Sequence, residues 1–461
     1  MSSRRASNSG SSIDSEGSGA QWFAAGSLWG FERLVLIVTT AIVQIMLARY
    51  LGTSGFGVLS AALAVSALVL PLTRFGLAGL VTSNLLENPE AELKILGTAM
   101  ALRLCGALVA CILGVAYLMG SGVFGTGSLG LVVLLVLAQL ACVAQVTEFA
   151  FQVRSSPKPL LRWRLPVTVI AAVLKCLAAS RTADPGLIAW IFAAESAVLS
   201  LVHVFALREL KGVSVRPRLD AHWQRHFAHR VPWLLASGLA EAVYLRIDLV
   251  MLTALRGPED AGVYAAASRL SEVWYALPAV VVMTLTPLLW GGGHSARRHR
   301  CLSQATLDGL FWSAVAAATL TTLVADRLVE LLFGAVFAEA AGVLQLHIWA
   351  GLFVFMRTFA SQWLIAEDLL RYSLLTHGCG AIVNVALNLV LIPEYGAGGA
   401  ALSTVVSYAF AGWLAFFVSA RTRPLARMMT CAICLPGRFR DLRGYWRWAK
   451  VATRNGGRYW D

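Results

Sequence analysis

We single out thirteen charged residues within the long apolar segments of this 461-residue chain. They are Glu32, Arg33, Arg74, Arg103, Glu148, Lys175, Glu195, Glu241, Arg246, Asp248, Arg269, Glu272 and Arg357. Each would cost about 2.5–3.5 kcal/mol at the centre of a lipid-facing helix. We therefore expect these side chains to pair with one another, to reach the membrane interface, or to line water.

Four of them are arginines on the first two apolar segments of each half of the chain: Arg33, Arg74, Arg246 and Arg269. The rise of a helix puts Arg74 at ~10 Å and Arg246 at ~22 Å from one side of the membrane. Guanidinium groups bind phosphate oxygens through two parallel hydrogen bonds. Four arginines at different depths in the membrane therefore suit a substrate that carries a diphosphate. Internal ion pairs are the alternative, and the three-residue spacing favours one between Arg269 and Glu272.

Four carboxylates on the same segments are candidate sites for a coupling ion: Glu32, Glu241, Asp248 and Glu272. A carboxylate in a dry wall favours a bound proton or cation, because a bare charge is costly there. Glu241 and Asp248 are seven residues apart and share one helical face. The alternative for Asp248 is a bracing role within its helix bundle.

The segments that carry these charges are long enough to cross a membrane. The chain is 58% hydrophobic and 14% charged, against about 25% charged residues in soluble domains, which excludes a soluble enzyme. Twelve apolar segments are predicted as helices, at 22–48, 57–81, 97–119, 128–153, 162–180, 186–207, 231–255, 262–290, 302–325, 340–365, 372–392 and 397–420. When Arg162 and Arg164, at the edge of segment 162–180, are counted with the loop before it, 27 of the 38 Lys and Arg residues fall on one side and four on the other. This asymmetry predicts that both termini are cytoplasmic.

The fold class predicted is an all-α polytopic membrane protein with twelve helices in two six-helix lobes. The predicted parts are a disordered cytoplasmic tail (1–20), an N-lobe (21–207), a basic linker (208–230), a C-lobe (231–420) and a basic, aromatic tail (421–461). An internal repeat aligns Gly52 with Gly257, each at the first hairpin of a lobe. Six helices per lobe give both lobes one orientation, related by a pseudo-two-fold axis along the membrane normal.

Several motifs resemble those of one transporter family. They are Leu47-Ala48-Arg49-Tyr50-Leu51-Gly52 with Gly55-Phe56-Gly57-Val58, then Arg246-Ile247-Asp248, then Asn384 to Asn388, and Ile392-Pro393-Glu394-Tyr395-Gly396. Together they resemble the polysaccharide-biosynthesis flippases, the O-antigen type of the MOP (MATE-like) exporter superfamily. The resemblance spans roughly residues 22–420.

This resemblance implies a flippase that moves a polyprenyl-diphosphate-linked oligosaccharide across the bacterial cytoplasmic (inner) membrane, for synthesis of O-antigen, capsule or exopolysaccharide. It implies alternating access through a cationic central cavity, carried here by Arg33, Arg74, Arg246 and Arg269. The expected partners are the lipid-linked oligosaccharide, a polysaccharide polymerase and glycosyltransferases. We expect no catalytic residues, cofactor, metal site or nucleic-acid partner.

Two other functions remain open at this point. One is a MATE-like multidrug or organic-cation antiporter, which the four arginines disfavour because its cavity would need negative charge. The other is a membrane glycan polymerase or ligase, which short outer loops without a nucleophile disfavour. The basic, aromatic carboxyl tail is expected to bind anionic membrane lipids in either case.

Overall fold

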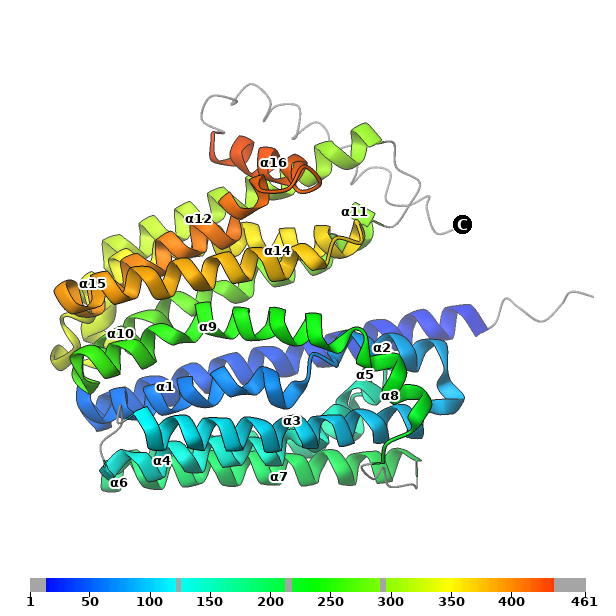
Figure 1. The fold of residues 1–461 in the computed structure, drawn as a ribbon, viewed down its shortest axis with the longest axis horizontal. Helices are drawn as coiled ribbons and strands as arrows, with labels where there is room; N and C mark the ends of the chain where they lie inside the picture. The colour runs from blue at the N-terminus through cyan, green and yellow to red at the C-terminus, as the bar shows by residue number, and fades with distance from the viewer. Residues whose placement is uncertain (1–13, 122–125, 212–217, 291–295, 435–461) are drawn as a thin grey trace, which may run out of the picture. The chain divides into compact units, whose positions relative to one another are not determined.

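The computed structural model describes residues 14–121, 126–211, 218–290 and 296–434, and every regular element within them is a helix (Figure 1). Long apolar stretches form helices in a membrane because a helix satisfies its backbone hydrogen bonds within one segment. The predicted all-α, polytopic membrane fold is confirmed.

The chain divides into two compact units, Met1–Leu239 and Ala240–Asp461, in agreement with the predicted two lobes. The division lies at Leu239, beyond the stretch 208–230 that was predicted as the linker. The first turns of the helix that follows pack on the first unit: Val231 belongs to its buried core, and Leu234 lies against Gly76. That packing moves the boundary into the helix.

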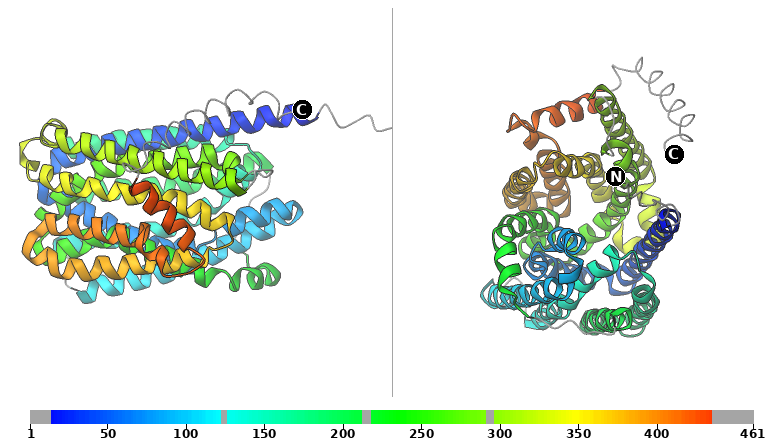
Figure 2. Two further views of the ribbon diagram at one scale, coloured as in Figure 1. Left: turned by 90° about the horizontal axis from the view of Figure 1, so that it is seen from above. Right: turned by 90° about the vertical axis from the view of Figure 1, so that its right-hand side faces the viewer.

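The first unit contains the helices that precede Val231 and the first turns of the helix that begins there (Figure 2). Its elements are α1 (Asp14–Arg74), α2 (Ala78–Glu87), η1 (Pro89–Ala91), α3 (Glu92–Ser121), α4 (Thr126–Leu137), η2 (Ala138–Thr147), α5 (Glu148–Val153), α6 (Lys158–Thr182), α7 (Pro185–Lys211) and α8 (Ala221–Ala228). Leu77, Ile95 and Phe151 are fully buried in one core that joins α2, α3, α5 and α8.

The described part of the second unit likewise consists of helices and short 3₁₀ segments. Its elements are α9 (Val231–Arg256), α10 (Pro258–Glu272), η3 (Val273–Tyr275), α11 (Ala276–Trp290), α12 (Ala296–Phe333), η4 (Ala335–Phe337), α13 (Ala340–His347), η5 (Ile348–Ala350), α14 (Gly351–Ala366), α15 (Arg371–Gly412), η6 (Leu414–Phe417) and α16 (Arg423–Ile433). The core of this unit, with Met356, Phe359 and Phe416 at its centre, joins α11, α12, α14 and α16.

Glycines in unusual backbone conformations form the hairpin turns. Within α1, Gly52 has φ 66° and ψ −176°, so α1 is two helices, and the chain reverses its direction there (Figure 1). Gly257, between α9 and α10, has φ 99° and ψ 177°. Both values lie in the region that only glycine adopts readily. The internal repeat that aligns these two glycines in the sequence therefore also holds in their backbone conformation.

Seven helical stretches are long and apolar enough to cross a membrane. They are Gly26–Glu87, Pro89–Gly120, Ser128–Val153, Pro185–Glu209, His299–Phe333, Ala340–Ala366 and Arg371–Phe417. The first and last contain the non-helical Gly52 and Gly396, so each of these is a pair of helices. Ten of the twelve predicted apolar segments lie wholly within helical elements, whereas 57–81 crosses the turn between α1 and α2 and 397–420 runs past the end of η6 at Phe417. The number of membrane crossings stays a prediction.

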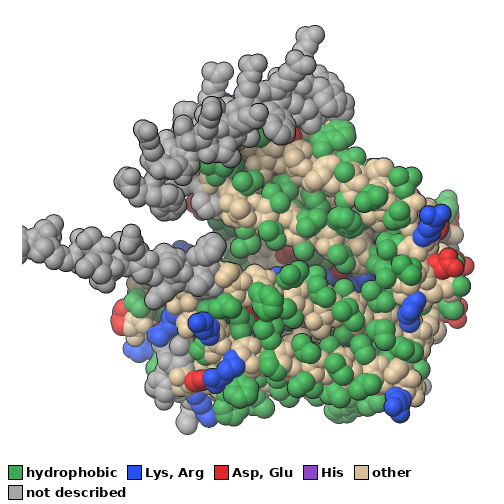
Figure 3. All heavy atoms as spheres, turned by 180° about the vertical axis from the view of Figure 1, so that it is seen from behind, with side chains coloured by type: hydrophobic (Ala, Val, Ile, Leu, Met, Phe, Trp, Pro, Cys, Tyr) green, Lys and Arg blue, Asp and Glu red, His purple; other side chains and the backbone are tan. Residues whose placement is uncertain are grey.

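The outside of both units is apolar. Large hydrophobic side chains such as Ile112, Met283 and Leu323 are exposed, and Figure 3 shows hydrophobic side chains spread over the visible surface. Most of the Lys and Arg side chains in that view lie toward its left and right edges, the sides at which the long helices of Figure 1 end. An apolar surface with charges at the helix ends is what a lipid bilayer requires of the protein inside it.

The segments predicted outside the lobes are partly helical. α1 already begins at Asp14, inside the predicted tail 1–20, of which residues 1–13 lie outside the described part. The predicted linker 208–230 contains α8, whose amino end is capped by the Asp220 carboxylate, and Trp223 and Phe227 of α8 are buried in the core of the first unit. This segment was predicted as a linker from its basic charges, and the amphipathic helix α8 within it was not predicted.

The predicted tail 421–461 contains α16, and residues 435–461 lie outside the described part. Leu425 and Met429 of α16 are buried in the core of the second unit. Trp312 of α12 also donates a hydrogen bond to the carbonyl of Ala432 over 3.1 Å. α16 is therefore a docked part of the second unit.

Candidate functional site

Two predicted arginines share one carboxylate in the second unit. Arg246 of α9 donates to both carboxylate oxygens of Glu272, over 2.9 and 3.5 Å, and Arg269 donates to the same carboxylate over 3.1 Å. About a quarter of each of these side chains is exposed. The predicted pair of Arg269 and Glu272 is present, and the group of three keeps one net positive charge.

Asp248 lies on another face of α9 and is almost fully buried. Its Oδ2 accepts hydrogen bonds from the hydroxyls of Tyr264 and Thr404, over 2.9 and 2.8 Å, and its Oδ1 accepts one from the Asn388 amide over 2.5 Å. These donors come from α10 and from the two halves of α15, so one carboxylate joins four helices. Charge-assisted hydrogen bonds of this kind are strong in a dry interior.

Glu241 lines a cavity of about 330 Å³ within the second unit. The same cavity is lined by Arg357 of α14, His377 of α15 and the aromatic rings of Tyr244 and Tyr408. Tyr244 stacks on His377, with 5.5 Å between their ring centroids. Although Glu241 and Asp248 are on one helix, the structure places them in separate environments: a cavity wall and a buried hydrogen-bond network.

Arg357 is a buried cation of this cavity that the predicted set of site residues omitted. Its guanidinium donates to Thr376 over 2.7 Å and to Ser373 over 3.1 Å, and it lies 2.7 Å from Nε2 of His377. None of these three partners carries a negative charge, so the positive charge of Arg357 remains in the cavity wall. The sequence signal was present, since Arg357 is the one charged residue of the apolar segment 340–365.

In the first unit, the structure gathers charges around an arginine that the sequence reading left in a loop. Arg164 of α6 lies 3.1 Å from Glu32 and 3.3 Å from Glu148, and His203 lies 3.7 Å from Glu148. Helix α6 begins at Lys158, four residues before the predicted segment 162–180, so Arg164 lies within the helix and not in the loop with which it was counted. Glu148 and Glu32 are thus members of one ion-pair cluster.

Arg33 and Arg74 are exposed and stand outside that cluster. Arg33 follows Glu32 directly, so its side chain points about 100° away from it around the helix. The structure therefore brings Arg246 and Arg269 together, and it does not bring Arg33 and Arg74 to the polar cluster of their own unit. A shared binding role of all four arginines stays a prediction.

Other charges have partners that the sequence did not assign. Lys175 pairs with Glu195 of α7, and Arg103 is buried with its guanidinium 5.6 Å from the ring of Phe149. Both form contacts inside the bundle, as the cost of a lone charge in lipid requires.

Comparisons with known proteins agree with this architecture. The family profile described as "Polysaccharide biosynthesis protein" matches residues 33–290. No curated protein matches the chain by sequence.

Several solved structures are similar to the chain over most of their length. A structure titled as the lipid II flippase MurJ in an inward closed conformation has a TM-score of 0.67 and 12% identity, over 88% of this chain and 91% of the other. An inward-facing multidrug resistance MATE family transporter of the MOP superfamily has a TM-score of 0.62 and 13% identity, over 85% and 99%. A MATE transporter of Vibrio cholerae has a TM-score of 0.54 and 13% identity, over 90% and 98%. At these identities the likeness establishes the fold.

Proposed function

Because this chain belongs to the polysaccharide biosynthesis protein family, we propose that it is a flippase for a polyprenyl-diphosphate-linked oligosaccharide. It translocates the repeat unit across the cytoplasmic membrane by alternating access, for assembly of a surface polysaccharide. The chain is a multi-pass membrane protein, and its termini are proposed to be cytoplasmic from the distribution of Lys and Arg.

One observation carries the choice of substrate: Arg246 and Arg269 share the single carboxylate of Glu272. Two guanidinium groups can exchange that carboxylate for the oxygens of a diphosphate, because both anions accept the same bidentate hydrogen bonds. Glu272 then serves as the internal counter-ion of the empty site. The partial exposure of all three side chains supports access to this group.

The same charges argue against the two alternatives. An organic-cation antiporter would need net negative charge at its site, whereas this group is net positive. A glycan polymerase or ligase would need a nucleophile or an activated acid, whereas the carboxylates of Glu32, Asp248 and Glu272 are held by arginines or hydroxyl groups. Fold likeness to MATE transporters leaves the substrate open.

We assign the coupling ion to Asp248, with Glu241, Glu272 and Glu32 as the other candidates. Asp248 joins α9, α10 and both halves of α15, so a change in its charge alters the packing of four helices at once. Binding of a proton or a cation at this carboxylate would therefore directly change the packing of the helices that move in transport.

The proposed function is tested by reconstitution. Proteoliposomes that contain the purified chain should move a fluorescent polyprenyl-diphosphate oligosaccharide between leaflets, detected by access of a membrane-impermeant quencher. A matched polyprenyl-monophosphate oligosaccharide should move at a much lower rate, because one phosphate engages fewer of the guanidinium donors. Equal rates for the two lipids, or transport of an organic cation in their place, would reject the proposal. In cells, deletion of the gene should lead to accumulation of the lipid-linked oligosaccharide in the cytoplasmic leaflet.

A further inference from the structure

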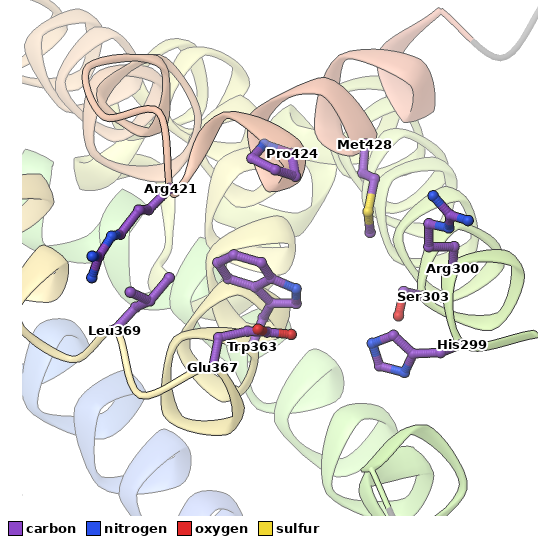
Figure 4. Close-up of a pocket in the computed structure, with 9 residues that line it drawn as sticks. All are labelled: His299, Arg300, Ser303, Trp363, Glu367, Leu369, Arg421, Pro424 and Met428. Carbon is purple, nitrogen blue, oxygen red and sulfur yellow. The ribbon is translucent and has the colours of Figure 1, made fainter. Parts of the chain in front are cut away.

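A second cavity, of about 490 Å³, lies within the second unit, apart from the arginine group described above. It is formed where α12 begins, where α14 ends, and beneath α16 (Figure 4). The short segments around it are rich in arginine, including Arg371, Arg421 and Arg423. On the predicted topology this cavity is at the cytoplasmic headgroup level of the membrane.

One side of the cavity is arranged for an anion. Arg300 and Ser303 are three residues apart on α12 and line the same wall, with His299 beside them. Ser303 is only 1% exposed, and its hydroxyl has no hydrogen-bond partner among the described residues. Buried hydroxyl groups are normally satisfied, so this one indicates an acceptor that occupies the cavity.

The other side of the cavity is arranged for an amine. The carboxylate of Glu367 points into the middle of the cavity, between Arg421 on one side and Ser303 and His299 on the other (Figure 4). The indole ring of Trp363, one turn earlier on α14, lies next to it. A carboxylate beside an aromatic face binds an ammonium group well, through a charged hydrogen bond and a cation–π contact.

We propose that this cavity binds the phosphoethanolamine headgroup of an aminophospholipid. The phosphate lies toward Arg300 and Ser303, and the primary amine lies against Glu367 and Trp363. A headgroup with negative charge alone would place that charge next to the carboxylate of Glu367, which is unfavourable. Ile365, Phe417 and Val418, near the cavity in sequence, are exposed and apolar, as expected where acyl chains leave the site. This site is independent of the transported substrate.

The inference is tested on the full-length chain in detergent by native mass spectrometry with equimolar phosphatidylethanolamine and phosphatidylglycerol. We expect the chain to retain phosphatidylethanolamine preferentially. In Glu367→Gln this binding should fall about tenfold, which corresponds to ~1.4 kcal/mol, and the preference should disappear. Asp368→Asn is the matched control, because Asp368 is the neighbouring exposed acid and asparagine tolerates its positive φ of 53°. That variant should bind like the unchanged chain.

Two further probes test whether the primary amine is recognised and whether the ligand is a membrane lipid or a soluble phosphoethanolamine compound. Phosphatidylcholine, whose methylated nitrogen cannot donate to Glu367, should bind more weakly than phosphatidylethanolamine. Soluble glycerophosphoethanolamine should fail to displace the bound lipid at an equal concentration, and displacement would overturn the lipid assignment. Equal retention of the two lipids by the unchanged chain, or a preference that persists in Glu367→Gln, would overturn the amine site itself.

Discussion

Arg246 of α9 donates hydrogen bonds from both terminal nitrogens of its guanidinium to the two carboxylate oxygens of Glu272 on α10, over 2.9 and 3.5 Å. Because Arg269 holds the same carboxylate, the pair is part of an unbalanced group with one positive charge in excess. A balanced ion pair would brace two helices and nothing more. An unbalanced group attracts an anion, and this difference makes the proposed role of Arg246 testable.

Arg246→Ala should reduce flipping at least about thirtyfold, because removal of one partner from a charged, hydrogen-bonded site costs about 2–5 kcal/mol. Arg246→Lys should recover part of the rate, since a point charge lacks the bidentate fork. The rate is measured in proteoliposomes with matched amounts of inserted protein. Arg256→Ala is the control, because Arg256 on the same helix forms only an exposed pair with Asp260. Full activity of Arg246→Ala would exclude Arg246 from substrate binding.

Asp248→Asn should distinguish ion coupling from bracing. The amide keeps the shape of the side chain but accepts fewer of the hydrogen bonds from Tyr264, Thr404 and Asn388, so a loss of about 1–3 kcal/mol in stability is expected. If Asp248 also binds the coupling ion, the folded variant should still bind the lipid-linked substrate but should fail to flip it. Thermal unfolding, substrate binding and flipping are measured on one preparation, and normal flipping would remove Asp248 from the coupling mechanism.

Arg164→Ala should strongly destabilise the first unit. It leaves Glu32 and Glu148 without their shared cation, and breaking a buried ion pair in this way costs about 3–5 kcal/mol. The control is Arg162→Ala on the same helix, whose pair with Glu209 is about half exposed and should contribute less than about 1 kcal/mol. Unfolding midpoints of the two variants in detergent are compared. Similar midpoints would show that the Arg164 cluster does not stabilise the unit.

Gly52→Ala and Gly257→Ala should each lower stability by about 1–2 kcal/mol, because their positive φ angles strain any residue with a Cβ atom. Steric overlap does not enter, since a Cβ at either position meets nothing within 4 Å. Gly309→Ala is the control: Gly309 is helical, has the same open space and should be neutral or slightly stabilising. Unchanged midpoints for both turn variants would contradict the strained turns.

Reporter fusions check the predicted topology. A reporter that is active only in the cytoplasm should work when fused after Lys211, at the end of α7, and after Cys434, just beyond α16. The second position leaves the docked helix α16 intact. A fusion after Arg256, at the turn between α9 and α10, should be active only with a reporter for the opposite side. Activity on the wrong side at any of the three positions would refute the twelve-helix arrangement.

The sequence was sufficient for the fold class and for most of the charges within the bundle, although it left out Arg164. Apolar length and the distribution of Lys and Arg are local properties, so they predicted the helical segments and the two lobes. The repeat at Gly52 and Gly257 predicted equivalent turns. The pair of Arg269 and Glu272 was also predictable, because three residues along one helix fix their proximity.

Only the tertiary structure decided which charges meet across helices. Arg164 pairs with Glu32, which lies more than a hundred residues earlier in the chain, and with Glu148, which lies 16 residues earlier. No periodicity of the sequence predicts either pair. Arg357 is a lone cation in sequence, and its cavity exists only because α9, α14 and α15 pack together. Likewise Asp248 and Glu241 share a helical face yet have different surroundings, since neighbouring helices cover one and leave the other beside a cavity. Helix formation depends on local backbone hydrogen bonds, whereas the pairing of buried charges depends on contacts that only packing creates.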